Sequence, residues 1–196
     1  TTSQPSPGQF REVFEALTAD GHQVLCLVIS SRLSGTYRSA LDARRALPDA
    51  DITVIDSYSV AAGLGLMALT AAEMAADGHA LDEIVARIEQ MKPDIRLYFV
   101  VDTLEYLQKG GRIGTASALI GTLLQVKPIL AIQDGIVQPL DKVRSRRKAL
   151  RRLLEDFEAQ VTPGQPVLCM LLHAQSPEEV QTLQAEMIQR LNCERV

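Results

Sequence analysis

The chain has 196 residues, of which 46% are apolar and 22% are charged, and its formal net charge is -4. This composition is typical of a folded globular protein with one large or two small domains, and it excludes a disordered chain. The acidic balance provides no global basic field for nucleic acid or an anionic membrane, and an aromatic content of 4% disfavours base stacking. We therefore expect no nucleic-acid partner.

The lengths of the apolar runs and the spacing of the cysteines indicate where in the cell the protein works. The longest runs, such as residues 24–29 and 167–172, fall far short of the roughly 20 residues that span a bilayer, so we expect no stable membrane insertion. Three cysteines, Cys26, Cys169 and Cys193, have the spacing of neither a disulfide framework nor a zinc knuckle. We expect them to be buried and reduced, in a cytoplasmic protein.

In the first half of the chain, apolar runs of strand length alternate with helical patterns. Apolar spacing predicts helices near residues 10–17, 36–46, 60–76 and 81–88, and buried strands at 24–29 and 52–55. Strand and helix in this alternation predict βαβ units with a parallel sheet. We therefore expect a first subdomain over residues 1–92 with a parallel, Rossmann-like sheet.

The second half has a different pattern. Strands are predicted at 97–101 and 167–173, and helices at 104–108, 116–123, 145–160 and from Ser176 onward. Residues 129–132 and 136–143 flank Asp134-Gly135, the best short signal of a β-hairpin. The fold class is therefore α/β with two subdomains, the second being a mixed sheet with a hairpin over residues 93–196.

The strongest local motif is residues 30–36, in which four hydroxyl side chains and a glycine lie between a buried strand and a helix start. In open α/β sheets, ligands bind at the carboxyl ends of the strands, and the helix amino terminus favours an anion. A carboxylate or a phosphate fits such a loop. A simple helix cap with spare serines explains the motif equally well.

Three further features have both a structural and a functional interpretation. The Gly63-x-Gly65 pattern lies inside a helix rather than at a strand–helix turn, which favours close packing over dinucleotide binding. Arg112 follows a glycine pair, where it is either a surface cation beside a helix end or a binder of carboxylate or phosphate. Residues 142–152 hold seven basic side chains, which form either a solvated helix face or a docking surface for an acidic protein or a phosphorylated ligand.

Taken together, these residues resemble the DegV family of bacterial lipid-binding proteins, over nearly the whole chain. The matching motifs are Thr2-Ser3-Gln4-Pro5-Ser6-Pro7, Ser30-Ser31-x-Leu33-Ser34-Gly35-Thr36-Tyr37-x-Ser39-Ala40, Asp56-Ser57 with Gly63-x-Gly65, Asp102-Thr103-Leu104-Glu105-Tyr106-Leu107-x-Lys109-Gly110-Gly111-Arg112-Ile113, Lys127-Pro128-Ile129-Leu130 with Asp134-Gly135, and Lys142-x-Arg144. Segments with which the family usually begins and ends are absent from this sequence. We therefore expect an interior fragment, with both subdomains incomplete.

The resemblance implies a non-catalytic protein that binds a long-chain fatty acid in the first subdomain, with its carboxylate at the subdomain junction. It implies presentation of that acid to a separate fatty acid kinase subunit, which forms acyl phosphate. It implies that Thr2 and Ser34 hydrogen-bond the carboxylate, with Ser3, Gly35 and Thr36 nearby, and that Arg112 and Arg144 face the head group or the kinase. From the residues themselves, we expect the small and apolar side chains of 61–76 to line the tunnel for the acyl chain, with Gly63 and Gly65 providing room. The resemblance implies no cofactor besides the fatty acid, no metal and no catalytic residue.

Two other functions remain open from the sequence. The first is phosphotransfer on a small hydroxy compound through Arg112 and the Ser34 loop, which requires a nucleotide site. The second is an interaction module that works through the basic residues 142–152, and whose partner binding weakens with salt. A long-chain acid buries some fifteen methylenes at about 0.8 kcal/mol each, and this burial dominates its affinity. The head group then needs only a few hydrogen-bond donors, which agrees with a fatty acid as the ligand.

Overall fold

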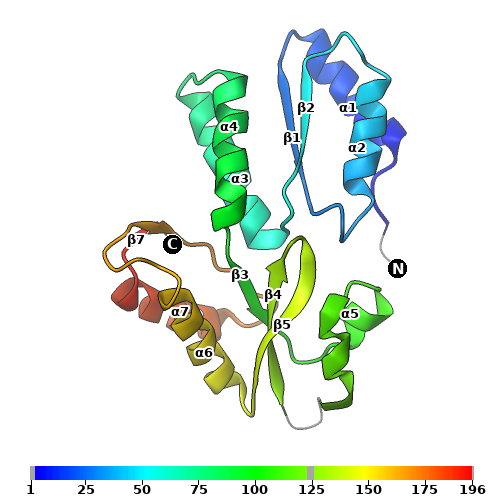
Figure 1. Ribbon diagram of the computed structural model, residues 1–196. Coiled ribbons are helices and arrows are strands. Elements are labelled where there is room, and N and C mark those ends of the chain that lie inside the picture. The colour runs from blue at the N-terminus through cyan, green and yellow to red at the C-terminus, as the bar shows by residue number, and fades with distance from the viewer. Residues whose placement is uncertain (1–2, 123–125, 196) are drawn as a thin grey trace. The chain divides into compact units, whose positions relative to one another are not determined.

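The computed structural model describes residues 3–122 and 126–195 and divides the chain into two compact units (Figure 1). Unit 1 comprises Thr1–Ile95 together with Asp134–Ile136, and unit 2 comprises Arg96–Gln133 and Val137–Val196. Each unit has hydrophobic clusters of its own. The described residues contain no helix that is both long and apolar enough to cross a bilayer.

Unit 1 is built on a parallel pair of strands, as the alternating pattern predicted. Strand β1 (Val24–Val28) pairs with β2 (Ile52–Asp56) in a register that runs from Val24↔Ile52 to Val28↔Asp56. The helices are α1 (Pro7–Ala19), α2 (Thr36–Arg45), α3 (Ala61–Ala76) and α4 (Leu81–Met91), followed by the short 3-10 helix η1 (Lys92–Asp94). The predicted α/β class is confirmed.

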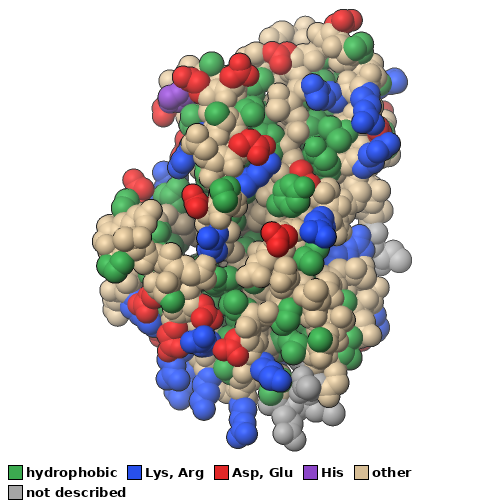
Figure 2. All heavy atoms as spheres, viewed as in Figure 1, with side chains coloured by type: hydrophobic (Ala, Val, Ile, Leu, Met, Phe, Trp, Pro, Cys, Tyr) green, Lys and Arg blue, Asp and Glu red, His purple; other side chains and the backbone are tan. Residues whose placement is uncertain are grey.

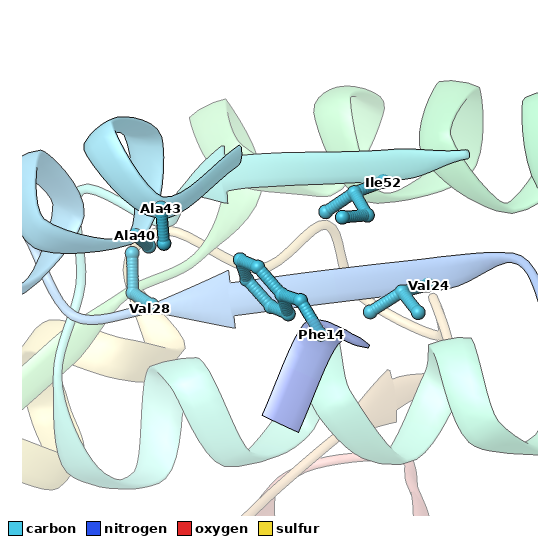
Figure 3. Close-up of a cluster of buried hydrophobic side chains, with 6 residues drawn as sticks. All are labelled: Phe14, Val24, Val28, Ala40, Ala43 and Ile52. Carbon is cyan, nitrogen blue, oxygen red and sulfur yellow. The ribbon is translucent and has the colours of Figure 1, made fainter. Parts of the chain in front are cut away.

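The two faces of this sheet bury two separate clusters, because side chains alternate along a strand. One face packs against α1 and α2, where Phe14 lies among Val24, Val28 and Ile52 (Figure 3). The other face packs against α3 and α4, with Met67 and other apolar residues around Ile55. Helices on both faces explain why the strands are continuous apolar runs. Unit 1 is therefore a three-layer arrangement (Figure 1).

In unit 2, an antiparallel sheet carries the hairpin that the sequence predicted. The sheet order is β3 (Leu97–Val100), β4 (Lys127–Gln133) and β5 (Ile136–Val143). Between β4 and β5, Asp134 and Gly135 have φ angles of 50° and 76°, the two positive values that a type I′ turn requires. The helices of this half are α5 (Glu105–Lys109), α6 (Arg146–Glu158) and α7 (Pro177–Arg190), with a 3-10 helix η2 (Gly114–Thr122).

A separate parallel pair, β6 (Val167–Leu168) and β7 (Cys193–Arg195), completes the described strands of unit 2. The predicted strand over residues 167–173 is wrong beyond Leu168. Its partner β7 has three residues, and the register shifts between Val167 and Leu168, so the ladder supports two residues of β6. In the described part of unit 2, the antiparallel sheet and the parallel pair are therefore two separate sheets and not one mixed sheet.

Two other predictions differ in detail from the structure. The helical pattern at 116–123 forms the 3-10 helix η2 instead of an α-helix, and Leu123 lies outside the described residues. Cys26, Cys169 and Cys193 are free thiols but half-buried rather than fully buried. Burial raises the pKa of the Cys26 thiol to about 11, so that thiol is protonated at neutral pH.

Candidate functional site

Buried polar side chains gather where β1 and β2 end. Parallel strands present their carboxyl ends at one edge of the sheet, so the loops that follow them meet there. Ser30 follows β1 and is 0% exposed, while Asp56, at the end of β2, is 7% exposed. Ser57 and Ser59, in the loop after β2, are 1% and 3% exposed. Polar groups buried to this degree need partners within the protein or a ligand.

The carboxylate of Asp56 joins the two loops. Its Oδ1 accepts a hydrogen bond from the backbone N–H of Ser31 at 3.1 Å and another from that of Tyr58 at 3.0 Å. The backbone N–H of Ser30 donates to the carbonyl oxygen of Ser59 at 2.8 Å. These bonds fix the loop after β1 against the loop after β2. Sequence reasoning placed Asp56 in a motif but missed it as a site residue, because no local pattern indicates a bond to the other loop.

The loop after β2 is held in an unusual backbone conformation. Tyr58 in this loop and Ala61, the first residue of α3, both have a φ of 49°, in the left-handed region that residues with a side chain rarely adopt. The Oγ of Ser57 donates to the carbonyl oxygen of Ser59 and accepts from its N–H, both at 3.1 Å. Such strain persists where surrounding contacts over-determine it, as they do at binding sites.

The hydroxyls of Ser34 and Thr36 form the part of the site that is best suited to an anion. The two oxygens are 2.8 Å apart and share one hydrogen, and the Ser34 Oγ also accepts from the N–H of Thr36 at 3.3 Å. Two hydroxyls carry two hydrogens, so one remains to donate outside the pair. Both residues are half-buried at the amino terminus of α2, whose dipole adds a positive potential. This arrangement can hold a carboxylate or a phosphate oxygen.

Gln4, in the first of the matching motifs, lies against Gly35 in the loop that holds Ser34 and Thr36. A Cβ at Gly35 would lie 2.6 Å from Nε2 of Gln4, so glycine is required if Gln4 is to stay in place. The segment around Gln4 therefore lies against the Ser34–Thr36 loop. The sequence analysis expects both segments to contribute to the same ligand site. Ser3 is exposed, and Thr2 lies outside the described residues.

The turn that follows β4 contacts the loop after β1. Ser30 Oγ donates to the carbonyl oxygen of Gly135 at 2.7 Å, and Arg32 Nη1 donates to that of Asp134 at 3.1 Å. A Cβ at Gly135 would lie 2.4 Å from Ser30 Oγ. All of these residues belong to unit 1. The hairpin turn thus contributes directly to the position of Ser30.

The two glycines of α3 have different surroundings. A Cβ at Gly63 would lie 2.1 Å from Ser59 Oγ and 3.0 Å from Cγ2 of Ile95, so this glycine permits close packing of the helix. Gly65 is half-buried in the same helix. Both lie within α3, and not at a strand–helix turn, which agrees with the packing interpretation. Their predicted contact with a fatty acid remains a prediction.

The two predicted arginines both belong to unit 2. Arg112 is exposed and donates from Nη1 to the carbonyl oxygen of Gly110. Arg144 is exposed between β5 and α6, and it forms no ion pair within residues 3–122 and 126–195. Their predicted roles toward the head group or a kinase remain predictions.

An ion-pair network that sequence reasoning missed joins several elements of unit 2. Arg146 at the start of α6 pairs with Glu179 at 2.7 Å and with Asp102 at 3.3 Å, and Lys127 pairs with Asp102 at 3.1 Å. The hydrogen bond from Lys127 and the charge of Arg146 lower the pKa of Asp102. The bond to Glu179 raises the pKa of Arg146. Part of the predicted basic face of α6 is therefore neutralised locally.

Basic side chains nevertheless gather along the lower margin of unit 2 in Figure 2, around the end of β5 and the start of α6. Four of them are exposed and form no ion pair within the described part of the chain: Lys142, Arg144, Arg147 and Lys148. The described residues also contain no group of three or more His, Cys, Asp or Glu side chains placed to hold a metal ion.

Comparison with known proteins gives a consistent family. The family model described as "Uncharacterised protein, DegV family" matches residues 1–196. A DegV domain-containing protein of Clostridium perfringens is 39% identical over 193 residues, which cover 96% of this chain and 66% of that protein. The chain thus spans about two-thirds of that relative's length.

Two solved structures have the same fold as this chain, and both are described as fatty acid binding. A DegV family protein from Thermus thermophilus, described as fatty acid binding, has a TM-score of 0.91 and 35% identity over 100% of this chain and 70% of its own. DegV of Bacillus subtilis, described as a fatty acid binding protein, has a TM-score of 0.85 and 33% identity, again over 100% of this chain and 70% of its own.

Proposed function

Because this chain belongs to the DegV family, we propose that it binds a long-chain fatty acid in unit 1, with the carboxylate on the hydroxyls of Ser34 and Thr36. The observation that carries this proposal is the 2.8 Å contact between the Ser34 and Thr36 hydroxyls, which uses one of their two hydrogens and leaves the other to donate outside the pair. Hydroxyl donors hold a carboxylate without neutralising it, while the buried methylenes supply most of the affinity. Relatives of 35% and 33% identity that are described as fatty acid binding support the same ligand.

The test is native mass spectrometry of the purified chain, followed by extraction and identification of any bound lipid. We expect a long-chain fatty acid at close to one molecule per chain, or uptake of added oleate to that level. A chain that carries no lipid and takes up none contradicts the proposal.

Variants of one loop assign the carboxylate contact. Ser34→Ala is expected to raise the Kd for oleate about tenfold or more, because a hydrogen bond to a charged group contributes about 1.5–3 kcal/mol. Ser31→Ala is the matched control, since Ser31 is exposed in the same loop and contacts Asp56 through its backbone N–H. Equal affinity of the two variants contradicts the assignment to Ser34.

We also propose that the chain is a substrate-presenting subunit and that a separate fatty acid kinase forms the acyl phosphate. The exposed cations Lys142, Arg144, Arg147 and Lys148 support a docking surface for an acidic protein partner. A mixture of the oleate-loaded chain, a fatty acid kinase catalytic subunit and ATP is expected to form acyl phosphate. Arg144→Glu is expected to slow this reaction while oleate binding stays unchanged, and an unchanged rate contradicts the docking role.

A second candidate, a phosphotransfer enzyme, shares the same loop, because the Ser34–Thr36 pair also fits a phosphate oxygen. It requires that the chain alone binds ATP. Calorimetric titration with ATP distinguishes the two: binding at micromolar concentrations favours the enzyme, and absence of heat favours the lipid carrier.

The predicted cytoplasmic location stays a prediction.

A further inference from the structure

Two half-buried thiols lie against each other in unit 2, Cys193 on β7 and Cys169 directly after the end of β6. The sulfur atoms of Cys169 and Cys193 are 3.5 Å apart, although the residues are 24 positions apart in the sequence. The parallel pairing of β6 with β7 brings them together: Val167 is in register with Cys193, and the N–H of Cys169 donates to the carbonyl oxygen of Arg195 at 2.9 Å. The backbone therefore holds both cysteines.

The surroundings of this pair are suited to a covalent link. The two sulfurs are 3.5 Å apart and a disulfide has an S–S distance of about 2.05 Å, so they need to approach by about 1.5 Å for the bond to form. Cys193 Sγ also contacts the carbonyl oxygen of Met187 at 3.7 Å, which orients its thiol. Both cysteines pack against the cluster of Leu154, Leu183, Met187 and Leu191. The pair thus lies where α7 packs against α6.

We propose that Cys169 and Cys193 are a modification site: by exchange with a low-molecular-weight disulfide they form a reversible disulfide that links the segment directly after β6 to β7. The bond would close the 24-residue separation that contains α7. A cross-link across a loop of this size restricts the unfolded chain, so the oxidised form is the more stable one.

The exchange balances in two steps. Cys193 as thiolate attacks one sulfur of the small disulfide, forms a mixed disulfide, and releases a thiolate that takes up a proton. Cys169 as thiolate then attacks the Cys193 sulfur, forms the protein disulfide and releases the second small thiol. The two protein thiols lose two electrons and two protons, and one small disulfide is reduced to two thiols.

The order of attack follows from the environment of Cys169. Burial, the hydrogen bond with Cys193 and the charge of Cys193 raise the pKa of Cys169 to about 12. Cys169 therefore starts the exchange poorly. We expect the reaction to be slow at neutral pH and to accelerate as the pH rises, because the thiolate is the attacking form.

The test treats the purified, reduced chain with excess oxidised glutathione and counts thiols after denaturation. The three free thiols are expected to fall to one, with a mass loss of two hydrogens and a peptide that links Cys169 to Cys193. The Tm is expected to rise by roughly 5–15 °C, from the loop length and the size of unit 2. Dithiothreitol should reverse all of these changes.

Matched variants identify the pair. On oxidation, Cys26→Ser should still lose two thiols and show the same rise in Tm as the parent chain. Cys193→Ser should form no internal disulfide and show no rise in Tm, and its Cys169 should remain a free thiol or carry a glutathione adduct. Circular dichroism confirms that each variant is folded. The proposal is overturned if glutathione adducts persist on the parent chain, if the link joins two chains, or if Cys26 is part of it.

Discussion

The carboxylate of Asp56, at the end of β2, accepts a hydrogen bond from the backbone N–H of Ser31, which follows the neighbouring strand β1. The same oxygen accepts the N–H of Tyr58, so a single buried side chain organises both loops of the candidate site. Hydrogen bonds to a charged group are the stronger ones, and a donor left unpaired in a buried site is costly.

Substitution of Asp56 is therefore expected to weaken the fold and the site together. Asp56→Ala should lower the free energy of unfolding by about 2–3 kcal/mol, because two backbone donors lose their acceptor. Asp56→Asn keeps an acceptor oxygen and should cost only about 1 kcal/mol. Urea denaturation measures both values, and equal losses for the two variants would show that the acceptor is unimportant.

The contact between Gly63 and Ser59 is expected to behave as a coupled pair. Gly63→Ala places a Cβ 2.1 Å from Ser59 Oγ, so we expect a loss of about 2 kcal/mol despite the better helix propensity of alanine. Ser59→Ala alone should be close to neutral, because this buried hydroxyl has no hydrogen-bond partner within the described residues.

The double variant Gly63→Ala/Ser59→Ala should recover most of the lost stability, since the nearest remaining atom of Ser59, its Cβ, is 3.3 Å away. The double-mutant cycle by chemical denaturation is expected to give a coupling of about 2 kcal/mol. Additive effects would instead indicate that Ile95, at 3.0 Å, is the main obstacle.

Gly135 in the hairpin turn is expected to tolerate alanine less well than another glycine of similar backbone conformation. Gly21→Ala at φ 79° meets no atom within 4 Å and should cost about 1 kcal/mol. Gly135→Ala at φ 76° adds a clash with Ser30 Oγ at 2.4 Å and should cost about 3 kcal/mol. Thermal and urea unfolding of both variants check this order, and similar costs would mean that the turn moves freely away from Ser30.

The ion pairs of Asp102 predict a component of acid sensitivity. Lys127 and Arg146 lower the pKa of Asp102 below its ordinary value of 3.8. A lowered carboxyl pKa contributes stability that is present above the ordinary pKa and is lost as the pH falls through the lowered value. Because Asp102 is largely exposed, solvent screening limits the contribution to about 1 kcal/mol or less.

Asp102→Asn should therefore flatten the dependence of unfolding free energy on pH below about pH 5, where carboxyl groups begin to protonate. Asp49→Asn removes an exposed carboxylate that forms no ion pair in the described part of the chain, and it serves as the control for net charge. Urea midpoints between about pH 3 and pH 7 provide the measurement. A profile for Asp102→Asn that matches the parent would contradict the role of the network.

The sequence predicted most elements because their signals are local. The apolar run at β1, the Asp134-Gly135 turn and the spacing of α6 each reflect one short segment and its own periodicity. The prediction failed at residues 169–173, where the extent of a strand depends on how much partner β7 offers. A strand's end is a property of its partner, and a single sequence window does not contain it.

The sequence by itself determined the class of the fold, the family and the loop with the Ser34–Thr36 hydroxyls, because these depend on residue types in order. The tertiary structure alone decided that Asp56 joins two loops, that Ser59 requires glycine at position 63, and that Arg146 is paired. The same holds for Cys169 and Cys193, which lie 24 positions apart in the sequence but are neighbours in space. Hydrogen bonds, close packing and ion pairs act over a few ångströms, and only the folded chain brings such residues within that range.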